Sequence, residues 1–293
     1  MPLRLFFAFV FSVLMASLGS QAEAADVPVG ALAPIYLKAP VAPPPSWTGF
    51  YVGGDIGGKW IDPEWSATSL RDPPGVTCPG GVGLPIDSTG NTNFDPLALR
   101  FGIFAGVNWQ IAPTWIVGIE GDYGYSHTTF THGGLPGCTI GCLGGFVFPP
   151  GGTAGGDQAS VSPGWDASLR ARLGYLVTPT LLVYGTGGIA WQGIEATGSC
   201  GPYVTSFYCI GPPQPDPSSV TKSAILTGWT VGAGAEWRFS PHWTLRGEYR
   251  FSDFNTWNSV FAFGATPGGG DNTYRFQLKV QTQIGTLGLA YLF

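Results

Sequence analysis

Regular alternation of apolar and ionic residues is the feature that most constrains how this chain can fold. In residues 243–252 the odd positions are mostly apolar, and the positions between them are Thr244, Arg246, Glu248 and Arg250. Because successive side chains of a β-strand point to opposite faces, this segment has one apolar face and one ionic face. The segments 98–111, 115–126, 164–177 and 224–239 alternate in the same way. The chain is therefore predicted to be all-β.

Three proline-containing stretches connect these segments in pairs. The stretches NWQIAPTWIVGIE (108–120), GYLVTPTLLVYGT (174–186) and EWRFSPHWTLRGE (236–248) each place a proline between two strand-like runs. Proline presets φ for a tight turn and is disfavoured in a central strand, so we predict short turns at Pro113, Pro179 and Pro241.

Four long segments rich in Gly, Pro, Ser, Thr and Asn are predicted to be loops. These are residues 61–97, 127–163, 195–223 and 253–273. Three turns alternating with four loops require eight strands, because each connection joins two of them. We place the strands near 48–60, 98–111, 115–126, 164–177, 181–194, 224–239, 243–252 and 274–293.

The position of the charges selects the architecture. A soluble sandwich also alternates, but here Trp and Tyr occupy both ends of the apolar face, as in the aromatic girdles of membrane barrels. A cation at the membrane midplane costs roughly 2–4 kcal/mol, and each unpaired backbone group in hydrocarbon costs several, so the charges must point inward and the sheet must close. We predict a closed eight-stranded antiparallel up-and-down transmembrane β-barrel with long extracellular loops and short periplasmic turns. The predicted interior charge network comprises Asp55, Lys59, Arg100, Glu120, Asp122, Asp166, Arg170, Arg172, Glu236, Arg238, Arg246, Glu248 and Arg250.

The first 46 residues are predicted to lie outside the barrel. Residues 1–24 contain Arg4, an apolar run of about 14 residues and the small-residue site Ala22-Glu23-Ala24, the pattern of a cleaved secretory signal. The rival interpretation, a membrane helix, needs roughly 20 apolar residues. Residues 25–46 form a Pro- and Ala-rich leader, and the barrel domain is predicted to span residues 47–293.

The last predicted strand contains two sets of apolar residues that lie on opposite faces. Leu287, Leu289, Tyr291 and Phe293 share one face and are predicted to contact lipid. The opposite parity is found for Tyr274, Phe276, Leu278, Val280 and Ile284. A bulge or strand break near residues 281–286 is expected to reconcile the two sets.

Several of these stretches together resemble a known family. The segments WTGFYVGGDIGGKW (47–60) and TLRGEYRFSDF (244–254), the hairpins around Pro113 and Pro179, and the terminal LGLAYLF are similar to the small outer-membrane β-barrels of alphaproteobacteria, often called porin-family or outer-membrane immunogenic proteins. The resemblance implies a barrel like the OmpA transmembrane domain, with its amino terminus in the periplasm and its long loops outside the cell. It also implies that Phe293 with Tyr291, in the terminal set with Leu287 and Leu289, acts as the signal for the barrel-assembly machinery.

No pattern in the sequence indicates catalysis, a metal or a cofactor. His127 and His132 lie in one predicted loop and His242 in a turn, without a third metal ligand at fixed spacing. The net charge of −5 includes no basic stripe, which argues against a nucleic-acid partner. Loop disulfides are expected in an exported chain, and the closest pairs are Cys138 with Cys142 and Cys200 with Cys209; the connectivity stays open, as does the fate of Cys78.

Three functions agree with these features. The first is a structural outer-membrane protein, in contact with lipid and lipopolysaccharide, whose inward charges pair and fill the barrel. The second is a narrow channel for small solutes, favoured by inward glycines such as Gly102 and Gly234 that leave volume. The third is a surface adhesin acting through the long loops. We favour the first, because a narrow interior with nearly balanced charge should neutralise itself.

Overall fold

The computed structural model describes residues 46–71, 97–133, 158–199, 219–265 and 271–293. The predicted signal segment, all but the last residue of the leader, and all five cysteines lie outside these ranges. Within them no helix has the length and apolar character to cross a membrane.

The described chain is all-β, as predicted. The strands are β1 (Gly49–Arg71), β2 (Leu97–Gln110), β3 (Trp115–Ser126), β4 (Phe130–Gly133), β5 (Gln158–Thr178), β6 (Leu181–Ser199), β7 (Ser219–Arg238), β8 (Trp243–Phe254), β9 (Trp257–Ala265) and β10 (Asp271–Leu292).

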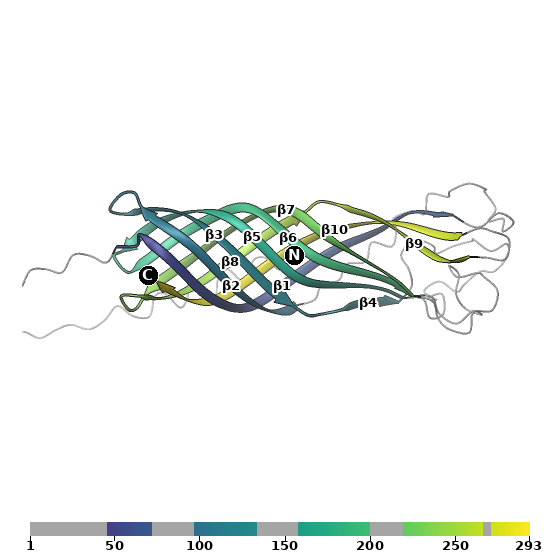
Figure 1. Ribbon diagram of the computed structural model, residues 1–293, viewed down its shortest axis with the longest axis horizontal. Coiled ribbons are helices and arrows are strands. Elements are labelled where there is room, and N and C mark those ends of the chain that lie inside the picture. Colours follow the sequence, from purple (N-terminus) through teal and green to yellow (C-terminus); the bar gives the residue numbers. More distant parts are fainter. Residues whose placement is uncertain (1–45, 72–96, 134–157, 200–218, 266–270) are drawn as a thin grey trace, which may run out of the picture. The chain divides into compact units, whose positions relative to one another are not determined.

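Eight of these strands form an antiparallel ring. β1, β2, β3, β5, β6, β7, β8 and β10 are consecutive neighbours, and β10 pairs in turn with β1, from Leu292 opposite Tyr51 to Thr273 opposite Arg71. The two short strands are additions to this ring, because β4 pairs with β5 and β9 pairs with β10. Figure 1 shows the strands running side by side with a common tilt.

The two ends of the ring carry different connections. At one end, short turns containing Pro113, Pro179 and Pro241 join β2 to β3, β5 to β6 and β7 to β8, as predicted. We call this the turn end, and β10 also finishes there (Figure 1). At the opposite end, the loop end, the chain passes repeatedly into segments outside the described residues.

The strands reach further toward the loop end than the sequence predicted. Parts of the four segments predicted as loops are strand, namely residues 61–71, 158–163, 195–199 and 219–223, together with β4 and β9. β1 has 23 residues and β10 has 22, well above the 9–11 that cross a bilayer. The long strands therefore continue beyond the length that a membrane requires.

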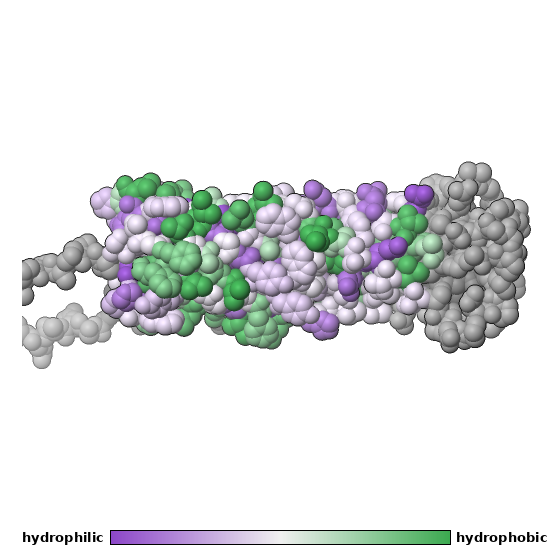
Figure 2. Space-filling model, in the orientation of Figure 1, coloured by the Kyte–Doolittle hydropathy of each residue, from purple (hydrophilic) through white to green (hydrophobic). Residues whose placement is uncertain are grey.

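The polarity of the wall inverts between its two ends. Near the turn end the outward residues are apolar and exposed, among them Phe101, Ile103, Leu169, Leu173, Leu245 and Leu287. Near the loop end the outward residues Asp62, Glu64, Glu195, Thr221, Arg275 and Gln277 are polar. On the face shown in Figure 2, green apolar patches gather over the turn-end part, and hydrophilic residues are more frequent toward the loop end.

The interior of the loop-end part is correspondingly apolar. One buried cluster, here called the loop-end core, contains Ile61, Trp65, Phe130, Ala159, Val161, Ala190, Ile194, Ala196, Leu226, Phe254, Phe261, Phe276, Leu278 and Val280. Its aromatic centre is compact, because the ring of Phe276 lies 4.6 Å from that of Trp65 and 4.6 Å from that of Phe261. The loop-end part thus has an apolar inside and a polar outside, like a water-soluble β-protein.

This core explains the parity of β10 and corrects one prediction. The register of β10 against β8 runs from Gln281 to Tyr291 without a shift, so the bulge expected near residues 281–286 is absent there. Phe276, Leu278, Val280 and Ile284 are buried inside the ring, whereas Leu287 and Leu289 are exposed outside it. One uninterrupted strand therefore supplies apolar residues to the interior at one end and to the exterior at the other.

Candidate functional site: the ionic interior

Twelve charged side chains lie buried inside the turn-end half of the ring. The six carboxylates are Asp55, Glu120, Asp122, Asp166, Glu236 and Glu248, and the six cations are Lys59, Arg100, Arg170, Arg172, Arg246 and Arg250. None of their side chains is more than 5% exposed. The formal charges sum to zero, since each of the six negative charges has a positive counterpart.

The ionic residues nearer the loop end form the loop-side group, which centres on two aspartates. Its members are Asp55, Lys59, Arg100, Asp122, Asp166 and Arg250. Asp166 lies 2.8 Å from Lys59 Nζ, 2.8 Å from an Arg100 nitrogen and 3.0 Å from an Arg250 nitrogen. Asp122 accepts from Arg100 at 2.8 Å and from Arg250 at 2.6 Å, and Arg100 also reaches Asp55 at 2.8 Å. Each of these cations except Lys59 bridges at least two carboxylates.

The remaining ionic residues form the turn-side group, which centres on two glutamates. Its members are Glu120, Arg170, Arg172, Glu236, Arg246 and Glu248. Glu120 accepts from Arg246 at 2.6 and 3.0 Å and from Arg170 at 2.7 Å. Glu248 accepts from Arg170 at 2.5 Å and from Arg246 at 2.6 Å. The two groups touch where Arg170 Nη2 lies 3.5 Å from Asp122 Oδ1.

A third carboxylate of the turn-side group pairs near the turns. Glu236 accepts from Arg172, and it also accepts from the Thr244 hydroxyl at 2.7 Å. The guanidinium of Arg172 lies 3.8 Å from the centre of the Tyr184 ring, a cation–π contact. The last charged layer before the turns is therefore also paired.

Polar residues that the sequence analysis did not select complete the network. The Tyr51 hydroxyl donates to Glu120 at 2.7 Å, the Tyr184 hydroxyl donates to Glu248 at 2.9 Å, and Ser168 donates to Asp122. Lys59 Nζ donates to Gln192 Oε1 at 2.5 Å. Tyr51, Ser168, Tyr184 and Gln192 all lie at inward positions of their strands. Their parity in the sequence is therefore the signal that could have identified them.

Strand alternation and ring geometry bring these residues together. Each lies at an inward position of its strand, and neighbouring strands supply adjacent pairs, such as Glu120 of β3 opposite Arg170 of β5. Other pairs cross the interior, because β3 and β8 stand four places apart in the ring of eight. Arg246 and Arg250 of β8 both reach carboxylates of β3 in this way.

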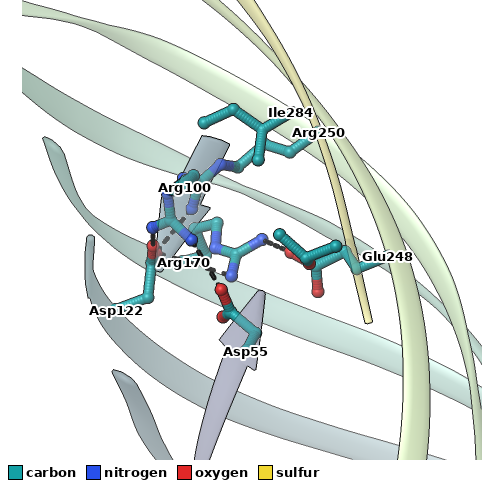
Figure 3. A pocket seen from close by; sticks show the side chains of 8 residues that line it. Asp55, Arg100, Asp122, Arg170, Glu248, Arg250 and Ile284 are labelled. Atoms are coloured by element: carbon teal, nitrogen blue, oxygen red, sulfur yellow. Dashed lines mark hydrogen bonds and ion pairs between the residues drawn. The ribbon is translucent and has the colours of Figure 1, made fainter. Parts of the chain in front are cut away.

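Inward glycines such as Gly124 and Gly234 make room for the side chains of the interior. A Cβ at Gly124 would lie 2.2 Å from Arg100 Nη2, and one at Gly234 would lie 2.6 Å from the Tyr184 ring. Figure 3 shows the small pocket between the two groups, where Asp55, Arg100, Asp122, Arg170, Glu248 and Arg250 converge. The space between these side chains does not admit a water molecule.

One predicted member of the network lies elsewhere. Arg238 is half-exposed at the turn end, where its Nη1 donates to the Ser46 carbonyl at 2.6 Å and its Nε donates to the Pro241 carbonyl at 3.0 Å. It has the inward parity of β7, but it is the last residue of that strand, so its long side chain reaches the turns. Parity alone could not distinguish a residue inside the ring from one at its rim.

The other predicted site residues do not belong to the ionic network. In the terminal set Leu287, Leu289 and Phe293 are exposed, and the Phe293 ring lies 5.0 Å from that of Tyr291. His242 stacks on Tyr291, and His127 lies beside Tyr125. Within the described ranges no cluster of three His, Cys, Asp or Glu side chains could hold a metal ion.

A ring of antiparallel strands whose turn-end half has an ionic interior and an apolar exterior is typical of outer-membrane β-barrel proteins. Residues 11–293 match the family described as the outer membrane protein beta-barrel domain. The chain therefore belongs to this family and is located in the outer membrane, which confirms the family resemblance seen in the sequence.

Two named relatives agree with this assignment. The chain is 30% identical over 292 residues to the 31 kDa outer-membrane immunogenic protein of Brucella melitensis, covering 96% of this chain and 99% of the relative. It is 25% identical over 284 residues to the 25 kDa outer-membrane immunogenic protein of the same organism, covering 97% and 96%. Among solved structures, the outer membrane protein OprG of Pseudomonas aeruginosa aligns over 84% of this chain and 96% of its own, with 13% identity and a TM-score of 0.44.

Proposed function

We propose that this protein is a closed, non-conducting barrel whose role in the outer membrane is structural, with its loop end outside the cell and its turn end in the periplasm. It anchors in lipid and lipopolysaccharide through the apolar band and displays the segments of the loop end. No catalytic step is part of this role.

The observation that carries this proposal is the neutral, filled interior. A conducting lumen needs continuous space for water and ions, whereas the pocket between the two groups, lined by six of the twelve ionic side chains, has no room for a water molecule. Side chains of an eight-stranded barrel are just large enough to fill its interior. Moving any one charge aside would leave its partners buried and short of opposite charge, which is unfavourable.

The inverted polarity of the wall supports the proposed orientation and the display role. The apolar exterior ends where the loop-end core begins, so the two parts suit lipid and water respectively. A packed apolar core can hold the extended strands upright beyond the membrane without lipid around them. An adhesive role of the loops would act through segments such as 134–157 and 200–218, which lie outside the described residues.

Single-channel recording in planar bilayers tests the filled interior. We expect no steady openings from the purified protein, in contrast to a porin measured in the same chamber. Steady openings whose conductance shifts in Arg170→Gln or Arg246→Gln, but not in the exposed control Glu195→Gln, would establish a narrow channel in its place.

Labelling of intact cells tests the orientation. In a variant with the five cysteines replaced by serine, Gln277→Cys at the loop end should react with a membrane-impermeant maleimide. Thr180→Cys, exposed in a turn, should react only after the outer membrane is permeabilised. The opposite pattern would reverse the proposed orientation.

A further inference from the structure

Trp47 closes the turn end of the ring from inside. It lies two residues before β1, yet its side chain is turned inward and only 1% exposed. It forms a buried cluster with Ile116 of β3, Leu176 of β5 and Leu182 of β6. Three strands of the ring thus enclose a residue that belongs to none of them.

Hydrogen bonds fix the Trp47 side chain and its backbone to two of the three turns. The indole Nε1 donates to the carbonyl of Pro179 at 3.1 Å. The backbone N–H of Trp47 donates to Gln110 Oε1 at 3.2 Å, and the same Gln110 donates through Nε2 to the carbonyl of Pro113 at 3.0 Å. Gln110 therefore links the incoming chain to the turn between β2 and β3.

Arg238 connects the same segment to the third turn. Its guanidinium lies 5.7 Å from the centre of a Trp47 ring and donates to the carbonyls of Ser46 and Pro241. The carbonyls of Pro113, Pro179 and Pro241 thus accept from Gln110, Trp47 and Arg238 respectively. The repeated proline of the three turns presents an equivalent acceptor at each position around the turn end.

We infer that Ser46–Thr48 acts as a stopper, held by Gln110 and Arg238, which separates the ionic interior from the solution at the turn end. This second barrier consists of the Trp47 side chain and hydrogen bonds between side chains and backbone groups, and none of the described ion pairs joins it to the twelve-residue network. The inferred closure of the turn end therefore does not depend on whether ions pass through the ionic interior. Arg238 and Gln110 are positioning residues for the stopper.

The accessibility of a thiol beneath the stopper tests this inference. In the cysteine-free full-length protein refolded into lipid vesicles, Leu182→Cys places a thiol in the cluster around Trp47. We expect slow reaction with a polar maleimide while Trp47 is present, and at least tenfold faster reaction after Trp47→Ala. Arg238→Gln should accelerate the reaction by a smaller factor, and Trp47→Phe, which keeps an aromatic ring, should change it least.

Ala190→Cys supplies the matched control. It lies on the same strand as Leu182 and is also buried, but it belongs to the loop-end core beyond the ionic groups. Its labelling rate should not respond to Trp47→Ala.

Two results would overturn the inference. One is equally fast labelling of Leu182→Cys with and without Trp47. The other is a parallel acceleration at Ala190→Cys, which would show that Trp47→Ala loosens the whole ring. Planar-bilayer currents of the same variants test the proposed non-conducting interior separately. The labelling contrast can be measured whether or not ions pass, so the stopper and the non-conducting interior can fail independently.

Discussion

Arg246 of β8 and Glu120 of β3 form a two-point ion pair across the interior, with Arg246 Nη1 2.6 Å from Glu120 Oε2 and Nη2 3.0 Å from Oε1. The same carboxylate also accepts from Arg170 and from the Tyr51 hydroxyl. Glu120 thus holds together opposite walls of the ring.

Removing the Glu120 carboxylate should be strongly destabilising. Glu120→Ala leaves Arg170 and Arg246 short of negative charge in a buried site, and such a change typically costs about 3–5 kcal/mol. Urea unfolding in lipid vesicles, followed by tryptophan fluorescence, measures the loss. The exposed Glu195→Ala should stay within about 0.5 kcal/mol of the wild type. A loss below about 1 kcal/mol at Glu120 would contradict a closely coupled network.

A cation on the apolar exterior should be costly only at the turn-end half. Ile103 is 65% exposed there, so Ile103→Arg should reduce the free energy of unfolding in vesicles by roughly 2–4 kcal/mol. Gln277→Arg, on the polar exterior near the loop end, should change it by less than about 0.5 kcal/mol. Equal costs at the two positions would mean that lipid covers both.

The loop-end core should contribute to stability in the manner of a soluble protein. Phe276→Ala empties a site between Trp65 and Phe261, and a buried Phe→Ala change typically costs about 3–5 kcal/mol. Its neighbour Gln277→Ala faces outward and should be nearly neutral, which controls for effects of substitution in β10. If both variants unfold at the wild-type urea concentration, the extended strands do not pack as described.

The terminal aromatic should matter more for assembly in cells than for the stability of the finished protein. Phe293 is 67% exposed and its backbone N–H donates to the Phe50 carbonyl at 2.9 Å, a bond that Phe293→Ala retains. We expect the variant to refold in vesicles with nearly unchanged stability but to reach the outer membrane in several-fold lower amounts. Quantifying the heat-modifiable form in membrane fractions measures this, with Leu245→Ala, at an exposed apolar position of β8 outside the terminal set, as the comparison. Wild-type levels of Phe293→Ala would exclude a role as an assembly signal.

The strands of the turn-end half were predictable because one rule covers them, except at the rim, where it misplaced Arg238. Alternation with period two assigns each residue to the inner or outer face, and the prolines at 113, 179 and 241 locate the turns. The family and the outer-membrane location also followed from the sequence.

The loop-end half was not predictable from the same rule. The lipid-facing placement expected for apolar residues fails at Phe276, Leu278 and Val280, which face inward as part of the loop-end core. A pattern of alternation shows that two faces differ, but it does not show which solvent lies outside. The roles of Trp47, Gln110 and Arg238 were missed for a related reason, since they depend on the meeting of three turns that are distant in sequence.

The uninterrupted parity of β10 has a consequence for how accurately this strand must be paired. Sliding β10 by one residue against β1 and β8 would exchange its two faces along the whole strand. In the proposed membrane placement, apolar side chains would then enter water at one end, while Thr286 and Gly288 would replace Leu287 and Leu289 against lipid at the other. Misalignment is thus penalised by two different solvents at once, and only the native alignment satisfies both.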